Sequence, residues 1–247
     1  MKIGRAIVLI AILWTLLNVG RLVFSNLGLG INQQNFIYTI LFVLFLVVIY
    51  KSSLVAEKGI DLSLSWRPNL AGSYLGGIFS LSLFSAVSVI LLKFYTDQIG
   101  LNNARSVKNL YDIFNLVILW PVLEELFFRN YLVQNLFKRY GLAKTILIGA
   151  ILFSLSHIGT GNGIFMQFFS GLFFCLIYLL ENKKILVTIF LHILMNSSII
   201  FLLTNSFFQS LILSISLPVI FTSLTGLALI YAYCIHLLLK ATKTKSA

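Results

Sequence analysis

Two adjacent glutamates, Glu124 and Glu125, lie in an apolar segment, and Arg129 follows them four residues later. A charged residue at the centre of a membrane helix costs roughly 2.5–3.5 kcal/mol on insertion scales, so such residues usually face the bundle interior and indicate a functional site. Glu125 and Arg129 share one helix face at this spacing, which predicts an ion pair. Glu124 is rotated by about 100° from Glu125, which leaves it free to reach another helix.

Two of the three histidines have polar company in other apolar segments. His157 ends the sequence Phe153-Ser-Leu-Ser-His, and His192 and Asn196 are four residues apart, on one helix face. His236 lacks a polar companion in its own segment and is interpreted as a structural histidine that forms a hydrogen bond across the bundle. Together, the carboxylates, the first two imidazoles and the amide are the groups that can activate water and stabilise an oxyanion.

The segments that carry these residues are long enough to cross a membrane. The chain has 247 residues, of which 59% are hydrophobic and 10% charged, whereas soluble domains have about 45–50% and about 25%. Several apolar runs approach the roughly 20 residues that a bilayer core requires. We therefore predict an all-α polytopic membrane protein of about eight transmembrane helices. The expected spans are 6–24, 36–51, 70–93, 111–137, 142–158, 163–180, 184–204 and 215–239.

The distribution of basic residues gives the orientation. If the N-terminus is cytoplasmic, most lysines and arginines fall on the cytoplasmic side of these spans, as the positive-inside rule requires. The cytoplasmic set is Lys2, Arg5, Lys51, Lys58, Arg67, Lys138, Arg139, Lys144, Lys183, Lys184, Lys240, Lys243 and Lys245. The opposite set is Arg21, Lys93, Arg105 and Lys108. We expect a multi-pass protein of the cell membrane with both termini cytoplasmic.

The chain divides into three parts within one membrane domain. Residues 1–110 hold about three N-terminal spans, residues 111–205 a catalytic core of about four spans, and residues 206–247 a C-terminal transmembrane helix with a basic cytoplasmic tail. Residues 207–217 form either the start of one long kinked helix at Pro218 or a short re-entrant piece before the last span. The net charge of +11 is attributed to anionic lipid headgroups, and no nucleic-acid partner is expected.

Three motifs resemble those of one protease family. Glu124-Glu125-x-x-x-Arg129, Phe153-x-x-x-His157 and His192-x-x-x-Asn196 resemble, in order, the motifs of the CPBP (CAAX protease and bacteriocin-processing, or ABI) intramembrane proteases. The resemblance covers about residues 112–204. Family members often have glycine after the arginine where this chain has Asn130, a departure that we expect to have little effect on the chemistry.

The resemblance implies hydrolysis of peptide bonds inside the membrane. Type II CAAX prenyl proteases of this family remove the last three residues of prenylated proteins, and bacterial relatives are similar to bacteriocin immunity proteins or peptide-processing enzymes. From the residue types we predict that Glu124 and His157 hold and deprotonate a water molecule. His192 and Asn196 then stabilise the oxyanion, and Glu125 and Arg129 orient the helix that carries Glu124. The expected substrate is a hydrophobic peptide or membrane protein.

Other interpretations remain open. Glu124, His157 and His192 can also be three protein ligands of a catalytic zinc ion with an open position for water. The usual His-Glu-x-x-His zinc helix is absent from the sequence, so the glutamate mechanism is favoured and no cofactor is firmly predicted. A small proton-coupled transporter would use the same side chains as relay groups, and a membrane immunity or binding protein would need no catalysis.

Overall fold

The computed structural model describes residues 2–28, 30–52, 61–64, 66–98, 110–158 and 164–243. These residues form helices and the connections between them, without a strand. The α-helices are α1 (Ile3–Asn26), α2 (Ile31–Ser52), α3 (Ala71–Gln98), α4 (Leu110–Phe114), α5 (Trp120–Glu125), α6 (Gln134–Ser156), α7 (Ile164–Leu180), α8 (Ile185–Thr204), α9 (Ser206–Ser214) and α10 (Leu217–Lys243). The all-α prediction is confirmed for this part of the chain.

The helix that carries the two glutamates departs twice from α-helical geometry. A π-helical stretch, η3 (Asn115–Leu119), separates α4 from α5, and a second one, η4 (Leu126–Val133), follows α5 and leads into α6. π-helical turns are rare and occur often at functional sites. Residues Trp120–Glu125 are thus a short α-helical piece between two widened stretches.

Gly141 separates this helix from the next one. Its φ of 72° and ψ of −173° lie in a region that only glycine adopts readily. The break falls between the spans expected at 111–137 and 142–158, and it lies inside α6, which therefore comprises two helical pieces. The second piece ends at Ser156, and His157 is its C-cap.

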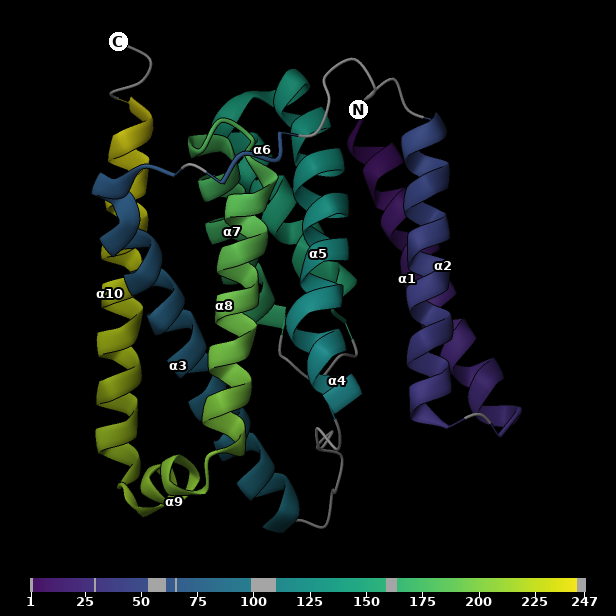
Figure 1. Ribbon diagram of the computed structural model, residues 1–247. Helices are drawn as coiled ribbons and strands as arrows, with labels where there is room; N and C mark the ends of the chain where they lie inside the picture. Colours follow the sequence, from purple (N-terminus) through teal and green to yellow (C-terminus); the bar gives the residue numbers. More distant parts are fainter. Residues whose placement is uncertain are drawn as a thin grey trace.

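The helices form a bundle with an attached hairpin (Figure 1). In the bundle, α6 packs on α7, α3 on α8, and α10 on α3 and α7. Helices α1 and α2 pair with each other, α1 also contacts α6, and α2 contacts α5. The main apolar core is richest in residues of η4, α6, α7 and α8, extends to buried residues of α1, α2, α3 and α10, and contains mostly phenylalanine and leucine side chains.

A close approach of α6 and α7 sets the position of the α6 end. A Cβ atom added at Gly171 would lie 3.0 Å from the Ala150 Cα and 3.1 Å from the Phe153 Cβ. Such small residues let helix backbones pack closely in membranes. Phe153 is thereby held in the core at 1% exposure, one turn before His157.

Four helical stretches of the described residues are long and apolar enough to cross a membrane. They are Gln33–Lys51, Pro68–Phe94, Ile185–Thr204 and Leu217–Thr242, and two shorter apolar stretches are Ile3–Leu16 and Ile164–Leu180. The predicted count of eight spans is not confirmed by length and composition. The expected spans at 111–137 and 142–158 are absent from this set: the first carries Glu124, Glu125 and Arg129 and is interrupted by π-helical turns.

The connection after α8 forms a separate short helix. Asn205 caps α9 by accepting a hydrogen bond from the Phe208 backbone N–H at 2.9 Å, and α10 begins after it at Leu217. Residues 206–214 are therefore not the start of one long helix. The beginning of α1 and the end of α10 lie at the same end of the bundle (Figure 1). Lys58, Arg105, Lys108 and Lys245 of the charge prediction lie outside the described residues.

Candidate active site

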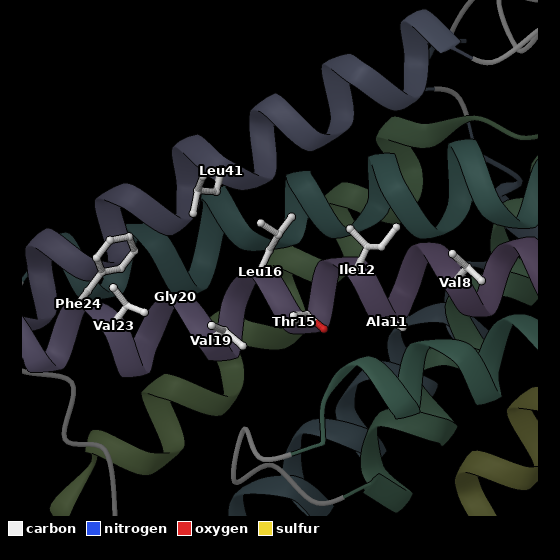
Figure 2. Close-up of a pocket in the computed structure, with 10 residues that line it drawn as sticks. All are labelled: Val8, Ala11, Ile12, Thr15, Leu16, Val19, Gly20, Val23, Phe24 and Leu41. Atoms are coloured by element: carbon white, nitrogen blue, oxygen red, sulfur yellow. The ribbon is translucent and has the colours of Figure 1, made fainter.

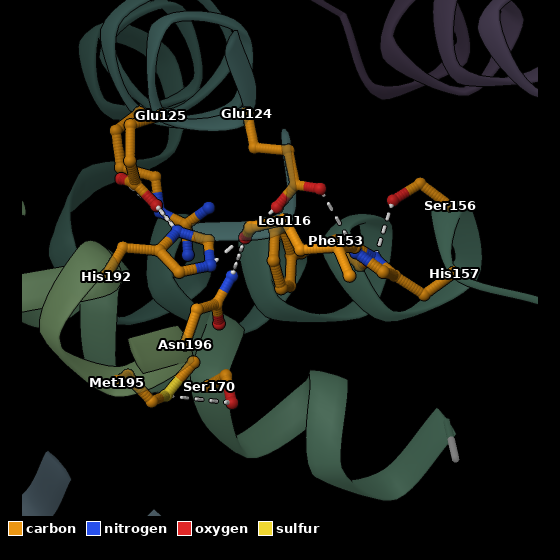
Figure 3. Close-up of polar contacts among 11 residues, drawn as sticks. Leu116, Glu124, Glu125, Phe153, Ser156, His157, Ser170, His192, Met195 and Asn196 are labelled. Carbon is orange, nitrogen blue, oxygen red and sulfur yellow. Dashed lines mark hydrogen bonds and ion pairs between the residues drawn. The ribbon is translucent and has the colours of Figure 1, made fainter. Parts of the chain in front are cut away.

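The carboxylate of Glu124 lies between the imidazole rings of His157 and His192 (Figure 3). The Nε2 atom of His157 is 3.6 Å from Oε1 of Glu124, and the Nε2 atom of His192 is 3.8 Å from Oε2. The Glu124 side chain retains 17% exposure and His157 retains 13%. The structure therefore brings together three of the predicted residues from α5, the end of α6, and α8, around a group that is still partly open.

The His157 ring is oriented by the end of its own helix. Its Nδ1 lies 2.8 Å from the Phe153 carbonyl oxygen and 3.1 Å from the Ser156 hydroxyl. Carbonyls in the last turn of a helix often lack backbone donors, and the Phe153 carbonyl accepts from the Ser156 hydroxyl at 2.7 Å and from an Nδ1–H of His157. In the neutral ring this tautomer leaves the lone pair on Nε2, which faces Glu124.

The His192 ring is oriented by Glu125. Its Nδ1 lies 2.8 Å from Oε1 of Glu125, and the ring stacks on Phe174 with centroids 4.8 Å apart. A histidine whose Nδ1–H is bound to a carboxylate has a fixed tautomer and orientation. The i, i+4 spacing predicted the contact of Glu125 with Arg129 but not this second contact, because His192 is 67 residues away in the chain.

The Glu125–Arg129 ion pair is completely buried. Nε of Arg129 lies 3.3 Å from Oε2 of Glu125, and both side chains have 0% exposure. Among the described residues, no acceptor forms a hydrogen bond with the Nη1 or Nη2 atom of Arg129. The guanidinium instead lies 4.4 Å from the ring centroid of Phe153 and 5.4 Å from that of Phe174. Such contacts are worth about 2 kcal/mol when desolvated, and they place the arginine between α6 and α7.

Asn196 lies on the same face of α8 as His192, as predicted, but its observed bond is to the backbone. Its Nδ2 donates to the Leu116 carbonyl oxygen at 2.9 Å, in the π-helical stretch before α5 (Figure 3). An amide NH₂ group has two hydrogens, so this bond uses one of them. The contact with Leu116 was not predicted from the sequence.

Asn130, the residue after Arg129, connects η4 with α2 and α7 through side-chain hydrogen bonds. Its Nδ2 donates to the Tyr50 hydroxyl of α2 at 2.7 Å, its Oδ1 accepts from the Tyr178 hydroxyl of α7 at 3.3 Å, and the Tyr50 hydroxyl donates to the Leu126 carbonyl at 3.0 Å. The position where relatives often have glycine thus holds a buried link between α2, η4 and α7 in this chain.

An apolar groove runs along α1, away from this cluster. It has a volume of about 580 Å³ and is lined by residues of α1 together with Leu41 of α2 (Figure 2). Among the lining residues that the structure describes, Thr15 alone has a polar side chain, and none of the predicted site residues is among them. Its surface is suited to contact with lipid, whereas the polar groups lie between α5, α6 and α8.

A zinc site would require Glu124, His157 and His192 to direct their donor atoms at one point. Glutamate and histidine are ordinary zinc ligands, but each imidazole of this site approaches a different oxygen of Glu124. In the part of the chain that the structure describes, no group of three or more His, Cys, Asp or Glu side chains is arranged to hold a metal ion. The described residues therefore give no support to the zinc alternative, and the glutamate mechanism stays the favoured proposal.

Fold and site together define a helical protein with glutamate and histidine side chains clustered inside an apolar bundle. Residues 106–198 match the family described as type II CAAX prenyl endopeptidase Rce1-like. Over these residues the chain is similar to that family, which confirms the predicted CPBP resemblance and indicates a CAAX-type peptidase of the membrane at the level of the family. No curated protein and no solved structure matches the chain.

Proposed function

We propose that this protein is an intramembrane endopeptidase that hydrolyses peptide bonds of hydrophobic or membrane-associated peptides. The observation that carries the proposal is the convergence of two imidazole Nε2 atoms on the Glu124 carboxylate inside an apolar bundle. A carboxylate and a neutral imidazole nitrogen are both proton acceptors, and together they can hold one water molecule and remove its proton.

In the proposed mechanism, Glu124 and the His157 Nε2 bind the attacking water. Glu124 takes the proton as the water oxygen attacks the scissile carbonyl, and the same carboxylic acid then donates it to the leaving amine. The Phe153 carbonyl holds His157 in the tautomer that this step needs, with Nε2 unprotonated. General acid–base catalysis of this kind contributes about 10²- to 10⁴-fold.

The oxyanion that forms is assigned to His192 and Asn196. His192 can donate from Nε2 only when the ring carries both protons, and the oxyanion and the Glu125 carboxylate then face that cation, since Glu124 holds the proton from water at this stage. The amide hydrogen of Asn196 that is not bound to Leu116 is the second donor. Preorganised donors in a site without bulk water are worth far more than the same donors in water.

The substrate is proposed to be a hydrophobic peptide or membrane protein that reaches the site from the bilayer. Processing of a peptide, or self-immunity to a bacteriocin, is the cellular role that the family resemblance supports. The arrangement of basic residues supports a location in the cell membrane with both termini cytoplasmic. The beginning of α1 and the end of α10 lie at the same end of the bundle in Figure 1, which is consistent with termini on one side of the membrane.

The first test compares two histidine variants. Detergent-purified protein is incubated with a panel of hydrophobic reporter peptides, and initial cleavage rates are measured by mass spectrometry. His157→Ala should lower kcat by about 10²-fold, because it removes one of two groups that hold the water. His236→Ala, which changes the exposed histidine of α10, is the matched control and should retain the wild-type rate.

The same experiment separates the alternative functions. An equal rate in wild type and His157→Ala would place the cleavage in a contaminant or another site. Absence of cleavage of every peptide by the wild-type protein would contradict the peptidase proposal. In that case the immunity or binding interpretation would be tested by isolation of a physical partner from the membrane.

The glutamate mechanism also predicts the response to metal removal. Treatment of the purified protein with 1,10-phenanthroline or EDTA, followed by removal of the chelator, should leave the cleavage rate within about twofold, since Glu124 and His157 bind the water without a metal in this mechanism. The rate and the bound-metal content are measured on the same sample. Loss of activity that zinc restores in proportion to bound metal would instead establish the zinc mechanism.

A further inference from the structure

The backbone just before the two glutamates contains a carbonyl that its own helix cannot satisfy. In an α-helix the Leu116 carbonyl would accept from the N–H of Trp120, but that N–H bonds to the Asn115 carbonyl in the π-helical stretch. With the i→i+5 spacing of a π-turn, the next donor for Leu116 would be residue 121. Residue 121 is proline, which has no N–H.

Asn196 supplies the missing donor from another helix. Its Nδ2 lies 2.9 Å from the Leu116 oxygen, and it comes from α8, one turn after His192. The bond is exposed at the surface of the bundle, and in the hydrocarbon core of a membrane an unsatisfied carbonyl costs several kcal/mol because no bulk water replaces the lost donor. The bond therefore fixes the π-helical turn at the entrance to α5 against α8.

We propose that Asn196 is a positioning residue for Glu124, acting through the Leu116 carbonyl that Pro121 leaves without a donor. The bond joins the helix that carries Glu124 to the helix that carries His192, and it lies on the side of α5 that precedes the glutamates. This role is separate from the oxyanion contact assigned to the other amide hydrogen, and it rests on the proposed function.

The test is a double-mutant cycle with Pro121. Asn196→Ala removes the side-chain donor on α8. Pro121→Ala restores a backbone N–H at residue 121, which in a π-turn can donate a hydrogen bond to the Leu116 carbonyl. We measure kcat, KM and the unfolding midpoint for the wild type, both single variants and the double variant. Rates are taken well below the unfolding midpoint, where a residue that only stabilises the fold would leave kcat unchanged.

The expected result is that the effect of Asn196→Ala depends on residue 121. It should lower kcat roughly tenfold more when residue 121 is proline than when it is alanine, as expected for the loss of one hydrogen bond between the two helices. The drop in unfolding midpoint should likewise be smaller in the Pro121→Ala protein. Pro218→Ala in α10 is the matched control and should show no coupling to Asn196→Ala.

Equal effects of Asn196→Ala in both proteins would overturn the inference and leave Asn196 as an oxyanion donor alone. Failure of Asn196→Ala to fold with either residue at position 121 would also overturn it, because the restored N–H should rescue folding. Failure of the proposed function is distinguishable, because a folded Glu124→Gln protein would then keep its activity whatever the outcome of the cycle.

Discussion

Replacement of Glu124 by glutamine should lower kcat by about 10³-fold while the protein remains folded. Glutamine has nearly the same shape, but it has no basic oxygen that can take a proton from water, and loss of a general base costs about 10²- to 10⁴-fold. The bundle should remain folded because Glu124 has no salt bridge with Arg129 and keeps 17% exposure. Initial rates on the best reporter peptide and a thermal unfolding curve measure the two effects.

Glu181→Gln is the control for this change. Glu181 is also buried, at 2% exposure, but it lies outside the site, where it accepts hydrogen bonds from the Tyr74 hydroxyl and the Arg67 backbone N–H. A glutamine oxygen can accept both bonds, so activity should be retained. If Glu124→Gln kept more than about a third of the wild-type rate at matched folding, Glu124 would not be the base that the mechanism requires.

Replacement of Arg129 by methionine should cause the largest loss of stability of any single change discussed here. It leaves the fully buried Glu125 carboxylate without its cation, and breaking a buried ion pair on one side costs about 3–5 kcal/mol. The change also removes the guanidinium from the rings of Phe153 and Phe174. The free energy of unfolding in mixed detergent micelles is the quantity to measure.

Two further variants isolate the charge. Arg139→Met changes an exposed arginine of the same helix and should alter the stability by less than about 0.5 kcal/mol. The double variant Glu125→Leu, Arg129→Met should be more stable than Arg129→Met alone, because no unpaired charge remains. Its activity should stay low, since His192 loses the carboxylate that orients its Nδ1. A loss below about 1 kcal/mol for Arg129→Met would contradict the assignment of a dry ion pair.

The local part of the site could be read from the sequence. The i, i+4 spacing of Glu125 and Arg129 was sufficient for their ion pair, because neighbours at this spacing share a helix face. The rotation of Glu124 away from them correctly predicted that it points to other helices. The order of the three motifs pointed to the family, although the roles of the individual residues stay predictions until the variants are measured.

The contacts between distant helices could not be predicted. Asn130 was expected to matter little, yet it joins Tyr50 and Tyr178 of two other helices, because packing decides what surrounds a buried amide. The π-helical turns depend on small differences between competing backbone bonds and leave no periodic signal. Pro121, three residues before Glu124, was the available sign that a carbonyl nearby would need an outside donor.

The assembly of the site from three helices has a consequence during synthesis of the chain. Glu124 comes from α5 and His157 from the end of α6, but His192 and Asn196 come only with α8. A nascent chain that has been translated only as far as α7 contains the water-activating pair without the groups on α8. In the proposed mechanism, cleavage would therefore begin only after α8 has left the ribosome and packed against α5, so that an unfinished chain would not cleave neighbouring membrane proteins.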